Sequence, residues 1–269
     1  MYLAIDIGGT KTLLAVFSKD GKLIESQKFP TPKDYIKFKS ELKKTVDKFF
    51  SQYKFAMACC AVPGRLNYKT GMAIGLGNLD WRNILIRADL SDILAVPVLV
   101  ENDAKLAGLS EAQLVLRQYS KVQYITVSTG IGGGVVIDGK LDDDSKYIEP
   151  GFMMLEHNGK LTKWEDFASG RAIVKRYGKK ASEIDDKKTW QAISRDLATG
   201  LIDVIALVQP DVVIIGGGVG AHFDKFGDLL TSALKKYENP LVPIPPIVGA
   251  KRPETAVIYG CYEYIKQNS

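Results

Sequence analysis

The sequence predicts an α/β fold made of two similar domains. Residues 1–16 contain two short apolar runs separated by a glycine-rich polar segment, which is the pattern of a β-hairpin with a polar tip. The same order of apolar run, glycine-rich tip and apolar run returns at residues 123–139. The length of 269 residues is large for one hydrophobic core and natural for two domains. Together these observations indicate an internal duplication.

The composition is that of an ordinary soluble globular protein, with 46% hydrophobic and 25% charged residues. No apolar run approaches the roughly 20 residues that span a bilayer. Residue 1 leads directly into an apolar run, without the basic and then apolar leader of a secreted protein. We therefore expect a cytoplasmic protein that does not enter a membrane.

Charge and cysteine content exclude several other classes. The net charge of +5 comes from scattered lysines and suits an anionic nucleotide without requiring nucleic acid. Of the three cysteines, Cys59 and Cys60 are adjacent in an apolar run, which matches neither a disulfide framework nor a CxxC metal pair. We expect the cysteines to be small buried hydrophobic residues.

The tip of the first hairpin has the composition of a phosphate-binding turn. It carries a carboxylate, two glycines and three hydrogen-bond donors, namely Asp6, Gly8, Gly9, Thr10, Lys11 and Thr12. Glycines let backbone amides approach an anion, and the carboxylate can hold a hydrated magnesium ion. No GxxxxGKS or GxxxxGKT segment is present, so the turn is not a P-loop. A plain glycine hairpin without a ligand is the alternative.

The rest of the first half alternates strands and helices. A third strand is expected at residues 22–29, and apolar residues at helical spacing predict an amphipathic helix over residues 34–49. The lysines of this helix are read as a solvated face. A buried strand at residues 55–62 runs into Pro63 and Gly64, where a sharp turn is expected.

A short strand at residues 98–100 ends in Glu101, Asn102 and Asp103, and a helix is expected to follow through about residue 115. In open α/β sheets, ligands bind at the carboxyl ends of parallel strands. These polar residues therefore mark a candidate binding site.

The second half repeats this logic. Its hairpin tip contains Thr129, Gly130 and Gly132, and residues 187–208 carry an apolar stripe at helical spacing that ends before Pro210. A buried strand is expected at residues 212–215, and it is followed directly by a glycine run that includes Gly217 and Gly218. Glycines at such a strand-to-helix junction let a flat ring or a phosphate lie against the backbone. Three glycine clusters at strand ends predict one nucleotide in a cleft between the two domains.

This order of elements resembles the ROK family of sugar kinases, within the superfamily of actin, sugar kinases and heat-shock chaperone ATPases. The resemblance covers nearly the whole chain. It rests on AVPG at 61–64, GNLDW at 77–81, ENDAKLAGLSE at 101–111, STGIGGGVVIDGKL at 128–141, EPGF at 149–152, WEDFASG at 164–170 and VVIIGGGVG at 212–220. The ENDA and ASG elements are particular to the family, whereas the glycine hairpins belong to the superfamily.

The resemblance implies two actin-like (ribonuclease H-like) domains with a central cleft. The expected N-terminal domain is 1–115, with a C-terminal helix at about 254–269 packing back on it, and the expected nucleotide-binding domain is 116–253. It also implies ATP and magnesium as cofactors, a hexose substrate and, as a family habit, a homodimer. The expected reaction is phosphoryl transfer to a hexose, with glucose and its 6-hydroxyl as the first candidate.

The resemblance also implies a sugar pocket formed by Asn102, Asp103, Glu149 and Glu165, with Gly64 and Asn78 as outer contacts. A carboxylate within hydrogen-bond reach of a sugar hydroxyl can take its proton as the oxygen attacks the γ-phosphorus. Asp103 is the candidate base. The alternatives are that Asp103 only caps the following helix and that Glu165 is a surface or capping residue.

Other functions remain open beside glucose phosphorylation. Fructose, mannose and N-acetylhexosamines are handled by relatives with these motifs, and a non-catalytic sugar or nucleotide sensor would keep the same pocket. ROK repressors place a helix-turn-helix before the first hairpin, and here the hairpin starts at residue 2. A DNA-binding role is therefore not expected.

One departure from the family concerns zinc. ROK kinases usually bind zinc through the His of an ExGH pattern and three cysteines of a following loop, but this chain has Phe152 at the His position and no cysteine in residues 153–164. Zinc needs four ligands, of which Glu156 and His157 supply at most two. We expect no zinc site, with His157 as a possible sugar contact. Apolar packing is expected to hold the loop through Phe152, Met153, Met154, Leu155, Leu161 and Trp164.

Overall fold

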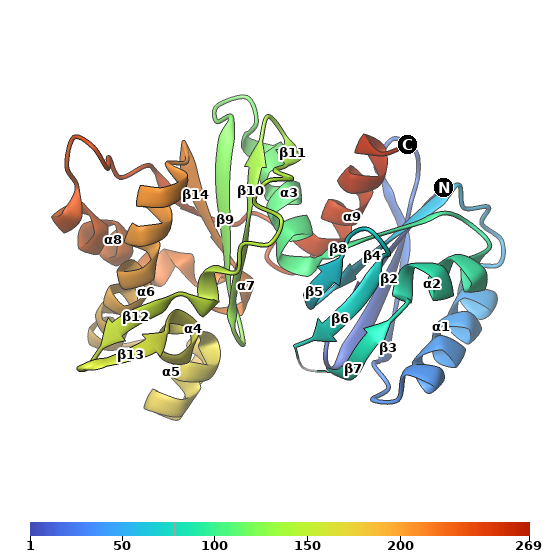
Figure 1. Cartoon of the computed structure of the whole chain (residues 1–269), viewed down its shortest axis with the longest axis horizontal. Helices are drawn as coiled ribbons and strands as arrows, with labels where there is room; N and C mark the ends of the chain where they lie inside the picture. The colour runs from blue at the N-terminus through green and yellow to red at the C-terminus, as the bar shows by residue number, and fades with distance from the viewer. Residues whose placement is uncertain (78) are drawn as a thin grey trace. The chain divides into compact units, whose positions relative to one another are not determined.

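The structure is a computed structural model that describes residues 1–77 and 79–269, so Asn78 lies outside the described residues. The chain divides into two compact units, Met1–Ser110 with Thr255–Ser269, and Glu111–Glu254. Each unit contains a five-stranded mixed sheet (Figure 1).

The sheet of the first unit has the strand order β3-β2-β1-β4-β8. Its strands are β1 (Tyr2–Ile7), β2 (Lys11–Phe17), β3 (Leu23–Pro30), β4 (Met57–Val62) and β8 (Val98–Asn102). The strand β1 pairs antiparallel with β2 and parallel with β4, and β4 pairs parallel with β8. Because β1, β4 and β8 run in the same direction, their carboxyl ends meet at one edge of the sheet.

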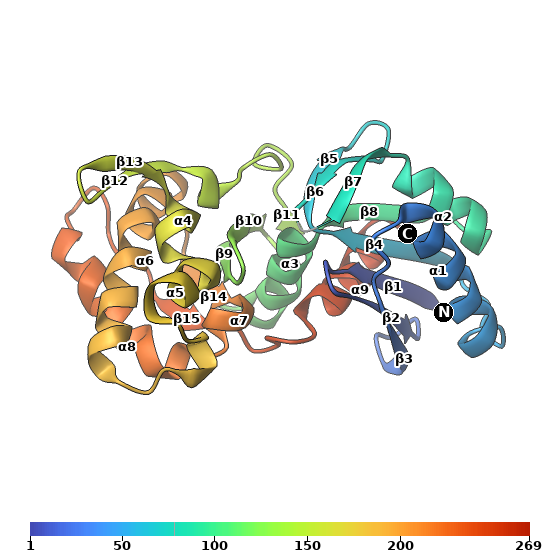
Figure 2. The ribbon, with the colours of Figure 1, turned by 90° about the horizontal axis from the view of Figure 1, so that it is seen from below.

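Helices cover both faces of this sheet, which explains why β1 is apolar on both sides. Leu3 and Ile5 pack with α1 (Tyr35–Phe49) and α2 (Ile86–Leu94). Ala4 and both Cys59 and Cys261 belong to the opposite core, where α9 (Ala256–Gln267) lies against β1 and β4 (Figure 2). All three cysteines are buried and free, as expected.

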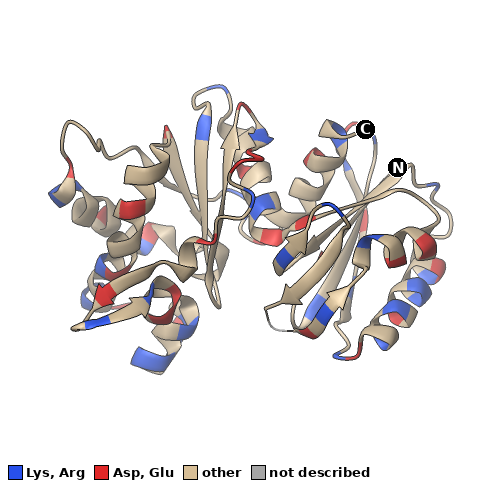
Figure 3. Ribbon diagram, in the orientation of Figure 1, with Lys and Arg blue, Asp and Glu red and all other residues tan. Residues whose placement is uncertain are grey.

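The amphipathic helix α1 begins where the sequence predicts. Asp34 caps it by accepting a hydrogen bond of 2.8 Å from the Lys37 N–H. Lysines and acidic residues both occur along this helix (Figure 3), and Lys43 lies 3.1 Å from Asp47 one turn later. Both side chains of this pair are exposed, which fits a solvated face.

A small antiparallel sheet in the first unit was not predicted. It consists of β5 (Gly64–Asn67), β6 (Met72–Leu76) and β7 (Leu79–Ile84), and it begins where a sharp turn was expected. Gly64 has a φ of 127°, and a Cβ atom there would lie 2.1 Å from the Gly75 carbonyl oxygen. This glycine lets β5 start directly after β4, so turn-forming residues here begin a new sheet.

The second unit repeats the topology of the first. Its sheet has the order β11-β10-β9-β14-β15, with β9 (Lys121–Val127), β10 (Ile131–Ile137), β11 (Lys140–Leu141), β14 (Val212–Gly216) and β15 (Ile247–Gly249). In both sheets a hairpin is followed by two parallel strands on the other side of the first strand. The expected α/β fold class and internal duplication are confirmed.

The remaining helices pack around the second sheet or join the units. They are α3 (Asp103–Val115), which crosses the boundary between the units, α4 (Trp164–Ala168), α5 (Gly170–Tyr177), α6 (Lys187–Val208), α7 (Gly217–Gly220) and α8 (Phe223–Leu234), with short 3₁₀ turns η1 (Pro150–Phe152), η2 (Ala181–Glu183) and η3 (Lys235–Tyr237).

The long helix α6 has the predicted bounds. Asp186 caps its start by accepting from the Thr189 N–H at 2.8 Å, and Trp190 and Leu197 lie on its buried stripe. It ends because Gln209 adopts a left-handed conformation and Pro210 cannot continue a helix. Among the described residues, no helix is long and apolar enough to cross a membrane.

The segment after the second hairpin forms a small hairpin of its own, β12 (Met154–His157) and β13 (Lys160–Lys163). Asn158 and Gly159 connect the strands with positive φ angles of 55° and 79°. The expectation of a loop held mainly by apolar packing is wrong in part, because Phe152 and Met154 are each 54% exposed and Leu161 is 72% exposed. Side chains alternate across a hairpin, so only some of the apolar residues can face the core.

Candidate functional site

The tip between β1 and β2 is a hydrogen-bonded turn supported by Thr31. The Gly8 N–H donates to the Lys11 carbonyl oxygen at 3.0 Å, and the Thr31 hydroxyl donates to the Gly8 carbonyl oxygen at 2.8 Å. Thr12 is fully buried, and its hydroxyl lies 2.9 Å from that of Thr31. Thr12 therefore supports the turn from inside, while Thr10 and Lys11 are exposed at the tip.

Asp6 is the one carboxylate of this turn. Burial raises the pKa of Asp6 to about 6, because the charged form loses solvation, and the nearby charge of Lys11 opposes this shift. Within residues 1–77 and 79–269, no group of three or more His, Cys, Asp or Glu residues is arranged to hold a metal ion. A single carboxylate fits magnesium that keeps several waters and takes its other ligands from phosphates.

The end of β8 places three of the predicted sugar residues together. The Asn102 side-chain amide donates to the Gly64 carbonyl oxygen at 3.1 Å, and its oxygen accepts from the Lys105 N–H at 3.2 Å. This second bond has the geometry of a helix cap, so Asn102 supplies the cap that was considered for Asp103. Asp103 opens α3, with one carboxylate oxygen 2.8 Å from the Ala104 N–H.

Glu165 lies under the tip of the second hairpin. Its carboxylate accepts from the Ile131 N–H at 3.4 Å, and a Cβ atom on Gly130 would lie 2.5 Å from the same oxygen. The other carboxylate oxygen lies 3.6 Å from the Arg171 guanidinium. The capping alternative for Glu165 does not hold, because Ser169 caps α5 through the Ala172 N–H.

Glu149 precedes η1 and is exposed. The turn that follows it packs on β10, since a Cβ atom on Gly151 would lie 2.2 Å from the Ile131 carbonyl oxygen. The chain segments that carry Glu149 and Glu165 therefore both contact Ile131. Phe152, at the position of the family histidine, is exposed with the Lys163 ammonium 4.7 Å from its ring centroid.

His157 is placed differently from the expectation. Its ring stacks on Phe167 at a centroid distance of 4.2 Å and an angle of 6° between the planes. The imidazole thus packs on the core as part of β12, and this contact would have to break before His157 could reach a sugar.

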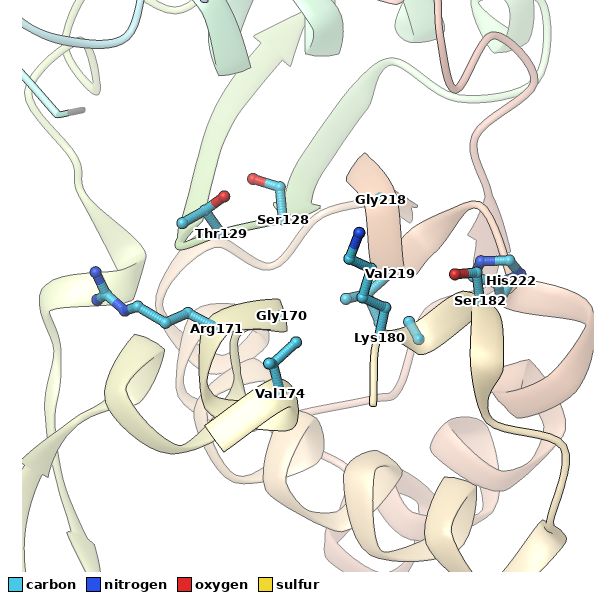
Figure 4. A pocket seen from close by; sticks show the side chains of 11 residues that line it. Ser128, Thr129, Gly170, Arg171, Val174, Lys180, Ser182, Gly218, Val219 and His222 are labelled. Carbon is cyan, nitrogen blue, oxygen red and sulfur yellow. The ribbon is translucent and has the colours of Figure 1, made fainter. Parts of the chain in front are cut away.

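A pocket of about 400 Å³ opens in the second unit (Figure 4). It is bounded by the hairpin tip, the starts of α5 and α7, and the chain around η2, with the lining residues Ser128, Thr129, Gly170, Arg171, Val174, Lys180, Ala181, Ser182, Gly218, Val219 and His222. The sequence predicts three glycine clusters around one nucleotide in a cleft between the domains; of these clusters, the second hairpin tip and the glycine run both line this pocket. Figure 4 shows Lys180 rising beside Val219, while Arg171 extends to the other side of Gly170.

The first two glycines of α7, Gly217 and Gly218, serve different purposes. Gly217 has a φ of 82°, and a Cβ atom there would lie 2.5 Å from the Thr126 hydroxyl, so the backbone requires glycine. A Cβ atom on Gly218 would meet nothing within 4 Å, although Gly218 lines the pocket. Space beside Gly218 therefore stays open for a ligand.

Several pocket residues were missed by reasoning from the sequence. Arg171, Lys180, Ser182 and His222 lie outside the glycine motifs, in segments whose approach to the pocket depends on how α5, η2 and α7 pack. Only Arg171 carried a signal, because it directly follows the ASG element.

Comparison with known proteins decides the family. A model of the ROK family matches residues 2–268. This chain belongs to the ROK family.

Relatives in the ROK family include a glucokinase of Streptomyces coelicolor, 24% identical over 98% of this chain and 97% of its own length. An N-acetyl-D-glucosamine kinase of Haemophilus influenzae is 29% identical over 97% of each chain. The crystal structure of a ROK family glucokinase from Streptomyces griseus with glucose and AMPPNP superposes with a TM-score of 0.84, 24% identity and 99% coverage of both chains. The expected ROK membership and two-domain actin-like fold are confirmed.

Proposed function

We propose that this ATP-dependent sugar kinase of the ROK family phosphorylates a hexose, with the 6-hydroxyl of glucose as the first candidate acceptor. The observation that carries the proposal is the junction of β8 and α3, where Gly64, Asn102 and Asp103 meet. Asp103 is the base in this proposal. It takes the proton of the hydroxyl as the oxygen attacks the γ-phosphorus of ATP.

The other polar residues orient the sugar. An amide has donor and acceptor positions beyond those that Asn102 uses for Gly64 and Lys105, so it can also bind a hydroxyl. Glu149 and Glu165 are proposed as acceptors of further hydroxyls. Because Glu165 also contacts the Ile131 N–H, it would link sugar binding to the phosphate-binding hairpin.

The pocket of the second unit is proposed to hold ATP. Its cationic side chains suit an anionic ligand, and the open space beside Gly218 suits a flat ring or a ribose. Backbone amides near Thr129 and Gly130, with Gly8, Gly9 and Thr10 of the first hairpin, are proposed to contact phosphates. Magnesium held near Asp6 through water would offset the negative charge of these phosphates.

The test is a coupled assay of ADP release with glucose, mannose, fructose, N-acetylglucosamine and N-acetylmannosamine. The relatives include both a glucokinase and an N-acetyl-D-glucosamine kinase, so the whole panel is needed. The sugar that gives the highest kcat/KM identifies the substrate. Sugar binding by calorimetry without ADP release for any member would instead favour the non-catalytic sensor.

Asp103→Asn tests the base. The amide keeps the size and the hydrogen-bonding geometry but cannot accept the proton, so kcat should fall by about 10² to 10⁴ while sugar affinity changes little. Near-normal turnover of this variant would exclude Asp103 as the base. The homodimer and the cytoplasmic location stay predictions, and sedimentation analysis tests the first.

A further inference from the structure

Two buried charged side chains and a partly buried tyrosine form a hydrogen-bonded group beside Asn102, which precedes the proposed base. Tyr68 donates from its hydroxyl to a Glu101 carboxylate oxygen at 2.7 Å, and the Lys105 ammonium lies 2.9 Å from the same hydroxyl. Glu101 is only 4% exposed and Lys105 only 6% exposed. Burying two charged groups costs solvation that their attraction often fails to recover, so such a group is weak evidence for a role in stability alone.

The three residues come from different elements and enclose the junction of β8 and α3. Tyr68 lies in the turn between β5 and β6, Glu101 in β8, and Lys105 in the first turn of α3. Asn102, Asp103 and Ala104 are the three residues between Glu101 and Lys105 in the chain. The side chains of Glu101 and Lys105 therefore connect both ends of this segment to Tyr68 of the small sheet.

Both ends of the group also contact Asn102 directly. A Glu101 carboxylate oxygen accepts from the Asn102 N–H at 2.7 Å, and the Lys105 N–H donates to the Asn102 side-chain oxygen at 3.2 Å. Asn102 in turn donates to the carbonyl oxygen of Gly64, the first residue of β5. These contacts form a closed circuit through β5, β8 and α3, and Asp103 belongs to the chain segment between Glu101 and Lys105 that the circuit spans.

We propose that Tyr68, Glu101 and Lys105 are positioning residues that hold Asp103 and Asn102 in the geometry needed to remove the proton from the sugar hydroxyl. The inference rests on the proposed function, because it concerns how Asp103 works as a base. Displacement of a catalytic group by 1 Å can cost about 10²-fold in rate. The circuit prevents such a displacement by fixing the backbone on both sides of Asp103.

The first unit offers a matched control. Tyr35 donates to Asp89 at 2.8 Å, and Lys39 lies 3.2 Å from the other carboxylate oxygen of Asp89. In both groups the lysine ammonium also lies over the tyrosine ring, at 5.3 Å for Lys39 and 5.4 Å for Lys105. The control group joins α1 to α2, and none of its contacts in the described part of the chain reaches Asn102 or Asp103.

The experiment compares Tyr68→Phe with Tyr35→Phe. Each substitution removes one tyrosine–carboxylate hydrogen bond of similar length, so both should lower the melting temperature by a few degrees. Only Tyr68→Phe should lower kcat, by about 10-fold to 10²-fold, with the KM for ATP unchanged. Equal kcat values for the two variants would overturn the inference and leave the proposed function intact.

A double variant separates positioning from stability. If Tyr68 acts through Asp103, Tyr68→Phe combined with Asp103→Asn should be no slower than Asp103→Asn alone. If the loss of kcat in the double variant equals the product of the losses in the two single variants, the inference is overturned. If Tyr68→Phe does not fold, Lys105→Met and its control Lys39→Met take its place, with the same expected difference. A wild-type protein that turns over no hexose would overturn both the inference and the proposed function.

Discussion

Asp6, the residue proposed to hold magnesium, lowers the stability of the folded chain at neutral pH. Its pKa is raised from 3.8 to about 6 because burial disfavours the charged carboxylate. Its side chain therefore binds a proton more tightly in the folded state than in the unfolded chain. The contribution of Asp6 to the free energy of unfolding falls as pH rises from 3.8 to about 6, and it stays low above that range.

The variant Asp6→Asn should reverse this effect, since an amide does not ionise. In the absence of magnesium and nucleotide, its melting temperature should exceed that of the wild type at neutral pH, and the difference should shrink below pH 4. Turnover with ATP and magnesium should fall, because the ion loses its carboxylate. Scanning calorimetry at several pH values measures the first effect. A difference in melting temperature that does not change with pH would show that burial of the charge is not its cause.

The residues of the proposed sugar site show how much a single position in the sequence can indicate. Asn102 and Asp103 were proposed because they form a polar dipeptide at a strand end, but the different hydrogen bonds that each makes depend on atoms that the sequence does not place. Asn102 caps α3 and binds the Gly64 carbonyl oxygen, which relieves Asp103 of the capping role. Tyr68 and Lys105 gave no signal, because a tyrosine in a turn and a lysine in a helix are common on surfaces.

At the scale of elements, α7 lines the pocket through Gly218 and Val219. Gly218→Val should weaken ATP binding at least tenfold while the protein still folds, because a branched side chain would fill open space that belongs to the pocket. Gly217→Val is the contrasting variant. Its positive φ and its close approach to the Thr126 hydroxyl should make it destabilising.

Binding of a fluorescent ADP analogue and thermal melts distinguish these two glycines. Unchanged nucleotide affinity in Gly218→Val would mean that the ligand does not lie against α7. A melting temperature of Gly217→Val equal to that of the wild type would show that the left-handed turn is not needed for folding.

The β12–β13 hairpin gives the prediction about zinc. Paired strands and a tight turn at Asn158 and Gly159 hold this segment, and Phe152 occupies the position of a family zinc ligand. We expect purified protein to contain no stoichiometric zinc, and a zinc chelator to leave activity unchanged when magnesium is in excess. Elemental analysis and the ADP-release assay measure these outcomes. One zinc ion per chain, or activity lost to the chelator, would contradict the prediction.

The β12–β13 hairpin also shows how a sequence pattern can give a wrong prediction for a whole element. A cluster of apolar residues in 152–164 predicts packing, yet alternation along two strands turns Met154 and Leu161 outward. The sheet β5-β6-β7 was missed for the opposite reason, because glycines and a proline near its start indicate turns. In both segments, the strand with which each strand pairs decides whether the chain forms a sheet and which of its side chains are buried.

For the whole molecule, the repeated order of apolar runs and glycine tips was enough to predict two related units. The two sheets have corresponding strand orders, and in each sheet the first strand of the hairpin has a parallel neighbour on its other side. The features that predicted the two units are local, because strand length, turn type and helical periodicity depend on residues that are consecutive in the sequence. The family motifs, which are also consecutive, carried the activity class.

The sequence by itself therefore determined the α/β class, the duplication, the bounds of α1 and α6, and the residues at the ends of β1 and β8. Only the tertiary structure decided that Glu165 lies under Gly130, that Thr12 is buried against Thr31, and that Tyr68, Glu101 and Lys105 form a hydrogen-bonded group beside Asn102. The physical reason is that these contacts join residues far apart in the chain. Their geometry follows from how strands and helices pack, and no local pattern of residues encodes it.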